Sequence, residues 1–224
     1  MKNSFYRKRP HDHFEKGVEI KHKPLKRTFD ITFSIFALLF GLPCFLLIAM
    51  CVKLSSRGPI FYSHERIGRG GKPFFCYKFR SMYKDSDERL KDLLNLHPEL
   101  RKEWEKTHKL KNDPRITPIG LFLRKSSLDE LPQFWNVLRG DLSVVGPRPV
   151  IKQEIEKYFG EKASVILSVR PGLTGIWQVS GRNNTAYSHR IQLDELYVNR
   201  QSLLLDLKLI AKTIPAMIFS KGAY

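Results

Sequence analysis

The chain has 224 residues, of which 42% are hydrophobic and 27% are charged, so its composition excludes a disordered or collagen-like chain. Lys and Arg number 39 against 22 Asp and Glu, and the formal net charge of +17 indicates an anionic partner such as nucleic acid, anionic lipid or a phosphorylated small molecule. The three cysteines form neither a C-x-x-C motif nor a disulfide framework, which favours buried, reduced thiols in a cytosol-facing protein.

The chain begins with a polar, basic tail of 28 residues, typical of a solvated segment that can also dock electrostatically on an anionic leaflet. Residues 31–52 then form an uncharged apolar run of 22 residues. As a straight helix this run would reach about 33 Å, which is enough to cross a bilayer. It starts too late, is too long and lacks the cleavage site expected of a secretory signal.

Two features argue against a plain membrane crossing by this run. Pro43 lies near its middle, where it removes an amide donor and disturbs the preceding turn. Basic residues flank both of its ends, and such flanks favour the cytoplasmic side of a membrane. The residues therefore leave two alternatives open, a re-entrant helix hairpin that bends at Pro43 and a bent single crossing.

Two short segments after the apolar run predict a β-hairpin. Residues 59–66 and 73–82 are rich in aromatic and β-compatible side chains, and the glycine-rich stretch 67–72 between them is typical of a turn. That stretch does not match a phosphate-binding loop. Lys78 and Arg80 are two residues apart and are expected on one face, where they would suit phosphate binding if they are not merely solvated.

Helical patterns occur on either side of the central part of the chain. Residues 85–111 predict a charged surface helix pair that is broken at Pro98. Residues 203–219 are too interrupted by charge to span a membrane and predict either an amphipathic interfacial helix or a core helix.

A short helix is expected at about residues 128–139, with Ser127 as its N-cap, Glu130 in a capping box and Gly140 as its stop. Pro132 would cost one backbone bond or move the helix start later. Asp129 should stay ionised near a helix amino terminus, where free amides can also hold phosphate oxygens. Whether Asp129 and Glu130 only cap this helix, or do chemistry, stays open at this level.

Basic residues near this carboxylate pair favour the chemical interpretation. Arg124 and Lys125 precede it, and Arg148 follows between two prolines. Cations around a carboxylate offset its repulsion from an anionic phosphoryl centre. The later loops at residues 169–175 and 181–184, with Trp177 and Gln178 between them, add further arginines that could flank a nucleotide.

With the hairpin, the carboxylate pair and the later arginine-containing loops in this order, the chain resembles the bacterial sugar transferases, the monotopic polyprenyl-phosphate phosphoglycosyl transferases. The resemblance covers nearly the whole chain from Lys26 onward. The segments that carry it are LKRTFD at 25–30, GPIFYSHERIGRGGKPF at 58–74, YKFRSM at 77–82, LRKSSLDELPQFWNVLRGDLSVVGPRP at 123–149 and RPGLTGIWQVSGRN at 170–183.

The resemblance implies an α/β (α+β) fold: a re-entrant membrane helix-hairpin, amphipathic interfacial helices and a small, mainly helical catalytic domain with a β-hairpin. The expected parts are a basic tail at 1–24, the membrane helix at 25–56 and a catalytic domain at 57–224 on the cytoplasmic face of the inner membrane. One departure concerns the helix break, where such relatives often carry Ser-Pro and this chain has Leu42-Pro43. Serine can satisfy a freed carbonyl and leucine cannot.

The resemblance also implies the chemistry. Asp129 is expected to attack the β-phosphate of a UDP-sugar, release UMP and carry the phosphosugar until undecaprenyl phosphate takes it. Glu130 would assist with metal or proton handling, and Mg²⁺ is expected at Asp129 and Glu130. The other expected site residues are Lys78, Arg80, Arg124 and Arg148 for substrate phosphates, and Arg170, Gln178 and Arg182 for nucleotide or sugar contact.

The expected partners are a UDP-hexose, undecaprenyl phosphate and membrane lipid, with no nucleic acid; a homo-oligomer is compatible with the resemblance. The insert at about residues 86–117 is similar to that of members that transfer galactose- or glucose-1-phosphate. Such an enzyme would begin exopolysaccharide or lipopolysaccharide O-antigen synthesis at the membrane. Two alternatives carry less support from the residues, a membrane-anchored nucleic-acid-binding protein and a non-catalytic assembly platform.

Overall fold

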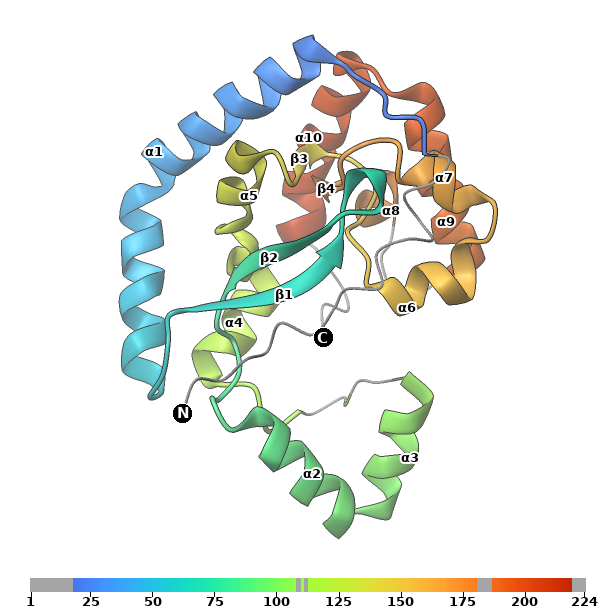
Figure 1. The fold of residues 1–224 in the computed structure, drawn as a ribbon. Helices are drawn as coiled ribbons and strands as arrows, with labels where there is room; N and C mark the ends of the chain where they lie inside the picture. Colours follow the sequence, from blue (N-terminus) through green and yellow to red (C-terminus); the bar gives the residue numbers. More distant parts are fainter. Residues whose placement is uncertain (1–17, 108–109, 111–112, 181–186, 219–224) are drawn as a thin grey trace, which may run out of the picture.

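The computed structural model describes residues 18–107, 110, 113–180 and 187–218. It is mostly helical, with one long helix curving around a body of shorter helices and two small two-stranded sheets (Figure 1). The predicted mixed α/β class is therefore confirmed at this level. The elements of the body besides those introduced below are α6 Lys152–Glu154, the π-helical turn Ile155–Phe159, α7 Lys162–Ile166, α8 Ile176–Val179 and α9 Tyr187–Arg200.

The apolar run forms most of helix α1, which spans Pro24–Ser55 and contains Pro43. The helix begins at Pro24. Proline suits the first turn because a backbone N–H at that position would have no acceptor inside the helix, so its absence costs no hydrogen bond. Pro43 does not break the helix into two arms: Figure 1 shows α1 as one curved element that does not fold back on itself. The residues left a hairpin and a bent helix open and the resemblance implied the hairpin; the structure shows a single bent helix.

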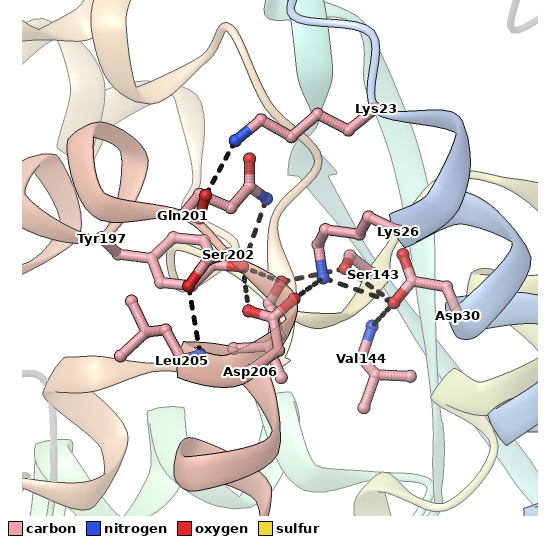
Figure 2. A network of polar contacts seen from close by, with 11 residues as sticks. Lys23, Lys26, Asp30, Ser143, Val144, Tyr197, Gln201, Ser202, Leu205 and Asp206 are labelled. Carbon is pink, nitrogen blue, oxygen red and sulfur yellow. Dashed lines mark hydrogen bonds and ion pairs between the residues drawn. The ribbon is translucent and has the colours of Figure 1, made fainter.

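Both ends of α1 are held on the same body. At the amino end, Lys26 Nζ lies 2.8 Å from Asp206 and 3.5 Å from Asp30, and Asp30 accepts a hydrogen bond from the Val144 amide (Figure 2). At the other end, Val52 is fully buried in an apolar cluster with Phe79 and other side chains. A helix fixed at both ends in this way stays alongside its own domain.

Between these two anchors α1 presents an apolar surface. Its length and mean hydropathy suffice to cross a membrane, and only 11% of its most apolar 18-residue stretch is buried against the rest of the protein. Cys44 is exposed on this helix and Cys51 half-buried, whereas Cys76 is buried, so the expectation of three buried thiols holds for Cys76 alone; all three are free. The exposed apolar side chains of α1 include Phe36, Leu39, Phe40, Leu42, Leu46, Leu47, Met50 and Leu54.

The predicted β-hairpin is confirmed. Strands β1 (Phe61–Ile67) and β2 (Pro73–Phe79) are antiparallel, and Phe61 pairs with Phe79. The glycine-rich stretch is the turn between them, with a short 3₁₀ turn at Arg69–Gly71. Gly70 and Gly71 have φ of 72° and 77°, which glycine adopts without the steric cost other residues pay.

A second, parallel pair joins two sequence blocks that lie far apart. Strand β3 (Ser143–Val145) pairs with β4 (Gly172–Thr174). A Cβ on Gly172 would overlap the backbone of Gly146, so glycine at position 172 allows the two segments to approach this closely. Nothing in the local sequence pattern predicted this pairing.

The charged helix pair is also confirmed, as α2 (Ser86–Leu96) and α3 (Pro98–Thr107). The C-terminal helix α10 (Leu203–Ile218) has two faces: Asp206 and Leu209 are buried against the body, while Leu204 and others are exposed. One face of this helix is thus part of the core, and the exposed apolar face leaves the interfacial interpretation a prediction.

Candidate active site

The carboxylate pair lies on a tight turn rather than inside a helix. Helix α4 (Pro118–Ser126) ends just before it, a 3₁₀ turn covers Leu128–Glu130, and α5 (Gln133–Arg139) follows. Pro132 moves the helix start later, as predicted, and Gly140 ends α5 with φ of 90°. The expectation of a helix from 128 is wrong, because Pro132 cannot supply the backbone donor that a continuous helix needs there.

Ser127 gives this turn its shape. Its φ of 57° is in the left-handed region, and its side chain makes no capping bond, so the expected capping box is not formed. Among the described residues it is the one non-glycine residue with positive φ. Strained backbone of this kind persists where surrounding packing fixes it. Leu128 and Leu131 supply that packing, since both contact the apolar cluster that holds the end of α1.

Lys78 bridges the two carboxylates. It lies on β2, and its Nζ is 3.4 Å from Asp129 Oδ2 and 2.6 Å from Glu130 Oε1. Asp129 is 6% exposed, whereas about a third of the Glu130 and Lys78 side chains remains open to solvent. The hairpin thus carries a cation to two acidic residues that are about 50 positions further along the chain.

Burial governs the titration of this group. Burial raises the pKa of Asp129, opposed by the nearby charges of Lys78 and Arg124 and assisted by Glu130. Burial also works to lower the pKa of Lys78, but attraction to Glu130 and Asp129 outweighs it, and the pKa of Lys78 is raised. The argument from a helix terminus missed this, because it could not foresee that Asp129 is buried.

Arg124 reaches the pair from the last turn of α4. Its Nε donates to Ser81 Oγ at 2.9 Å, and Asp129 and Asp113 oppose the effect of burial, which lowers the pKa of Arg124. Asp113 is held in turn by Arg115, with Nε–Oδ1 and Nη2–Oδ2 distances of 2.8 and 2.7 Å. Ser81, Asp113 and Arg115 thus position Arg124, and sequence reasoning identified none of them.

Arg80 has a different role from the one expected. Its guanidinium donates to the carbonyl oxygens of Val52, Ser56 and Arg57 at 3.2, 2.7 and 3.0 Å. These carbonyls lie at and just beyond the end of α1, where helix carbonyls lack internal partners. Arg80 therefore ties the end of α1 to the hairpin, and these contacts do not support phosphate binding by it.

Arg148 lies close enough to Lys78 for its charge to act on that residue. Its charge opposes the rise in the pKa of Lys78 described above. Its guanidinium carbon is 5.3 Å from the centre of the Trp177 ring. Arg190 packs on the same ring at 5.1 Å and is ion-paired with Asp194 at 3.8 Å. Burial raises the pKa of Asp194 to about 7.

The remaining expected residues are dispersed. Gln178 is buried on α8. Arg170 Nε donates to the Gly140 carbonyl at 2.8 Å, at the far end of α5 from Asp129. Its charged neighbours are Arg69, Arg27 and Asp30, not the carboxylate pair. Arg182 lies outside the described residues.

Asn136 is a further residue that the sequence did not single out. It is fully buried on α5, accepts a hydrogen bond from the Tyr77 amide at 3.0 Å, and donates to the Phe75 carbonyl at 2.7 Å and to Asp141 at 3.1 Å. These bonds fix the strand that carries Lys78 against α5. An asparagine inside an apolar helix face is the signal that could have identified it.

The arrangement joins a buried carboxylate, a second carboxylate and several cations beside an apolar helix. No three His, Cys, Asp or Glu side chains come together as a metal site within the part of the chain that the structure describes. The charges of Lys78 and Arg124 both act on Asp129, and that of Arg148 acts on Lys78, so positive charge gathers around the carboxylate pair.

Comparison with known proteins agrees with this chemistry. A profile of the family described as "Bacterial sugar transferase" matches residues 21–220. The chain is 50% identical over 200 residues to "Exopolysaccharide production protein ExoY" of Rhizobium meliloti (strain 1021), covering 89% of this chain and 88% of that protein.

Two longer relatives are named for a reaction. The chain is 50% identical over 201 residues to "Undecaprenyl-phosphate galactose phosphotransferase" of Salmonella typhimurium, covering 89% of this chain and 42% of that one. It is 36% identical over 214 residues to "Undecaprenyl-phosphate glucose phosphotransferase" of Komagataeibacter xylinus, covering 89% and 37%. With a family match across 200 of its 224 residues, the chain belongs to the bacterial sugar transferases.

Proposed function

We propose that this enzyme transfers a hexose-1-phosphate from a UDP-hexose to undecaprenyl phosphate through a covalent intermediate on Asp129. The observation that carries the proposal is the buried Asp129 carboxylate, bridged to Glu130 by Lys78 and flanked by Arg124. The galactose and glucose phosphotransferase names of two relatives support the substrates. The ExoY relative's name supports a place in exopolysaccharide production.

The reaction has two displacements at one phosphorus atom. In the first, an Asp129 carboxylate oxygen bonds to the β-phosphorus while the bond from that phosphorus to the bridging oxygen breaks, and UMP leaves with the electron pair. In the second, a phosphate oxygen of undecaprenyl phosphate bonds to the same phosphorus and Asp129 is released. Splitting one transfer between two anions into two steps is the usual gain of covalent catalysis.

The cations have the task of stabilising negative charge. Lys78 keeps Asp129 in its ionised, attacking form, and both Lys78 and Arg124 would face the phosphoryl oxygens as charge builds on them. Arg148, beside the Trp177 ring, is placed to meet the nucleotide part of the donor. Glu130 is bound more tightly by Lys78 than Asp129 is, which suits a supporting role over attack.

The residues at this turn fit a magnesium ion. Mg²⁺ is commonly bound through one or two carboxylates, with phosphate oxygens and water completing its shell, and Asp129 and Glu130 offer two carboxylates on one turn. When bound, the ion would neutralise charge on the diphosphate of the donor. The absence of a third acidic ligand among the described residues agrees with a site that the substrate completes.

The fold supports an active site at the membrane surface. Because both ends of α1 are fixed to the body that carries Asp129, its exposed apolar middle can enter one leaflet while both ends stay on one side. We retain as part of this proposal the expected division into a tail at 1–24, a membrane helix at 25–56 and a cytoplasmic catalytic domain at 57–224, which the fixed ends of α1 support. The acceptor phosphate, fixed in the bilayer, would meet the soluble donor at the lipid surface.

The test is a donor-dependent assay with purified full-length protein. Radiolabelled undecaprenyl phosphate, Mg²⁺ and a panel of UDP-sugars should give one lipid-linked hexose phosphate and an equal amount of UMP. Asp129→Asn should abolish both products, and Lys91→Gln, an exposed substitution on α2, should leave them unchanged. Normal turnover by a folded Asp129→Asn variant would overturn the assignment of the nucleophile.

A further inference from the structure

A second basic site lies at the amino end of α1, away from the carboxylate pair. Six basic residues and one acidic residue line a narrow recess there, a formal net charge of +5. The basic residues are Lys21, Lys23, Lys26, Arg27, Arg69 and Arg170. The roles proposed for the active site use none of the first five.

The fold brings these cations together from three separate segments. The Lys21 amide donates to the Ser168 carbonyl at 3.1 Å, which fixes the chain leading into α1. The Gly70 amide donates to the Leu167 carbonyl at 2.8 Å, which fixes the turn that carries Arg69. Arg170 is held by the Gly140 carbonyl. The cluster is therefore built by backbone contacts rather than by chance proximity of flexible side chains.

The acidic residues nearby are already occupied. Asp30 accepts bonds from the Val144 amide, from Ser143 and from Lys26. Asp206 pairs with Lys26 and accepts from the Tyr197 hydroxyl at 2.8 Å, as Figure 2 shows. These two carboxylates bond chiefly to Lys26 and its neighbours, and they offset only part of the charge on the other cations, since Asp30 acts to raise the pKa of Arg170 and Asp206 that of Lys23.

The other cations repel one another. Burial lowers the pKa of Arg170, and the charges of Arg69 and Arg27 lower it further. The pKa of Arg69 is lowered by burial and by Arg27, and that of Lys23 by burial and by Lys21. Holding like charges together costs folding energy, and a bound anion would relieve that cost.

A groove continues from this recess beside the first turns of α1 and α10. It has a volume of about 320 Å³ and shares Lys23, Lys26 and Gln201 with the recess. Its walls include Leu25, which is 74% exposed in the first turn of α1, and Leu203 in the first turn of α10. Positive charge beside an apolar groove at the start of two apolar helices matches a phosphate headgroup with its acyl chain.

The recess is separate from the reacting centre. Arg170 is held at Gly140, whereas the carboxylate pair precedes α5 at its other end. The seven residues of α5 rise about 10 Å, so one phosphate group cannot contact both places. A phosphate group bound in the recess would therefore be different from the one that reacts.

We propose that Lys21, Lys23, Arg69 and Arg170 form a binding site for the phosphodiester headgroup of an anionic bilayer phospholipid, which seats the amino end of α1 in the leaflet. The proposal rests on the membrane association argued above but not on the phosphotransfer chemistry. Its contribution is to fix the depth and tilt of α1, and with them the height of Asp129 above the lipid surface.

The test uses full-length protein in nonionic detergent and two short-chain lipids, dihexanoylphosphatidylglycerol and dihexanoylphosphatidylcholine, titrated by calorimetry. The double variant Lys21→Gln/Arg69→Gln removes two cations that line the recess. The control Lys91→Gln/Lys102→Gln removes two exposed cations on α2 and α3. At about fivefold per basic residue, the test variant should bind phosphatidylglycerol about 25-fold more weakly, while the control matches wild type.

The same variants separate this site from the substrates. The proposal expects the Lys21→Gln/Arg69→Gln variant to keep the wild-type KM for UDP-sugar and for undecaprenyl phosphate in detergent. Equal phosphatidylglycerol binding by the two double variants, or equal binding of both lipids by wild type, would overturn it. So would a rise in either KM, which would make the recess part of a substrate site. Lipid binding needs no turnover, so failure of the phosphotransfer proposal would leave this result standing.

Discussion

Replacing Lys78 by methionine tests how the site keeps a buried carboxylate ready to attack. Lys78 Nζ is 3.4 Å from Asp129, and at an effective dielectric constant of about 20 one charge pair at that distance is worth about 5 kcal/mol. Since 30% of the Lys78 side chain is open to solvent, we discount this to about 2–3 kcal/mol. The expected loss in the rate of UMP release is then about 30- to 150-fold.

The pH dependence of the variant distinguishes this role from simple misfolding. Without Lys78, burial and the repulsion from Glu130 act on Asp129 unopposed by the nearest cation, so its pKa rises further. The inflection of the rate against pH should therefore move upward, and part of the lost activity should return at alkaline pH. Lys78→Arg keeps the charge and Lys91→Met is the exposed control. A Lys78→Met variant with a wild-type rate and an unshifted inflection would refute the reasoning.

The other predictions concern stability and reactivity. Asp129→Asn should stabilise the fold, because burial raises the pKa of Asp129 in the native state. The charged carboxylate destabilises the native state at pH values above this raised pKa, and it has no effect below the pKa of the unfolded chain, where Asp129 is protonated in both states. The increase in melting temperature should therefore grow from acid to neutral pH. A melting temperature that falls at neutral pH would contradict this. Asn136→Ala should lower the free energy of unfolding by about 2–4 kcal/mol, measured by denaturant titration, because three buried hydrogen bonds are lost; a change below about 0.5 kcal/mol would show that they add little. Burial raises the pKa of the Cys76 thiol to about 11, so at pH 8 it should react with iodoacetamide far more slowly in the native protein than after unfolding in urea, as peptide mass spectrometry would show; equal rates would contradict its burial.

Local sequence signals predicted the elements that depend on neighbouring residues. The β1–β2 hairpin follows from two aromatic segments around a glycine-rich turn, and the end of α5 follows from Gly140. The break between α2 and α3 follows from Pro98. In each of these cases the backbone preference of a few adjacent residues decides the outcome, so tertiary contacts do not override it.

The features that the sequence did not predict depend on residues far apart in the chain. The parallel pairing of β3 with β4 needs glycines at 146 and 172 to meet. Arg80 was expected at the active site from strand alternation, yet the carbonyls at the end of α1, about 25 positions earlier, bind it. Such partners cannot be read from periodicity, because only the assembled fold brings them together.

The site was predicted in part for the same reason. Adjacent positions placed Asp129 and Glu130 together, and the resemblance implied that Lys78 binds substrate phosphate; its Nζ lies 2.6 Å from Glu130, a contact that was not predicted. Spacing could not show that Asp129 is buried, nor that Arg170 lies with Arg69 at the other end of α5. Burial and charge clustering are properties of packing, which no local pattern specifies.

The most direct test is the mass of the protein caught between its two half-reactions. Full-length enzyme would be incubated with the UDP-sugar it uses and Mg²⁺, without lipid acceptor, then quenched in acid and digested. The account predicts a peptide containing Asp129 that carries one hexose phosphate and that loses it when undecaprenyl phosphate is added before quenching. A hexose phosphate found on Glu130 or on another residue, or product formed with no modified peptide at any time, would contradict it.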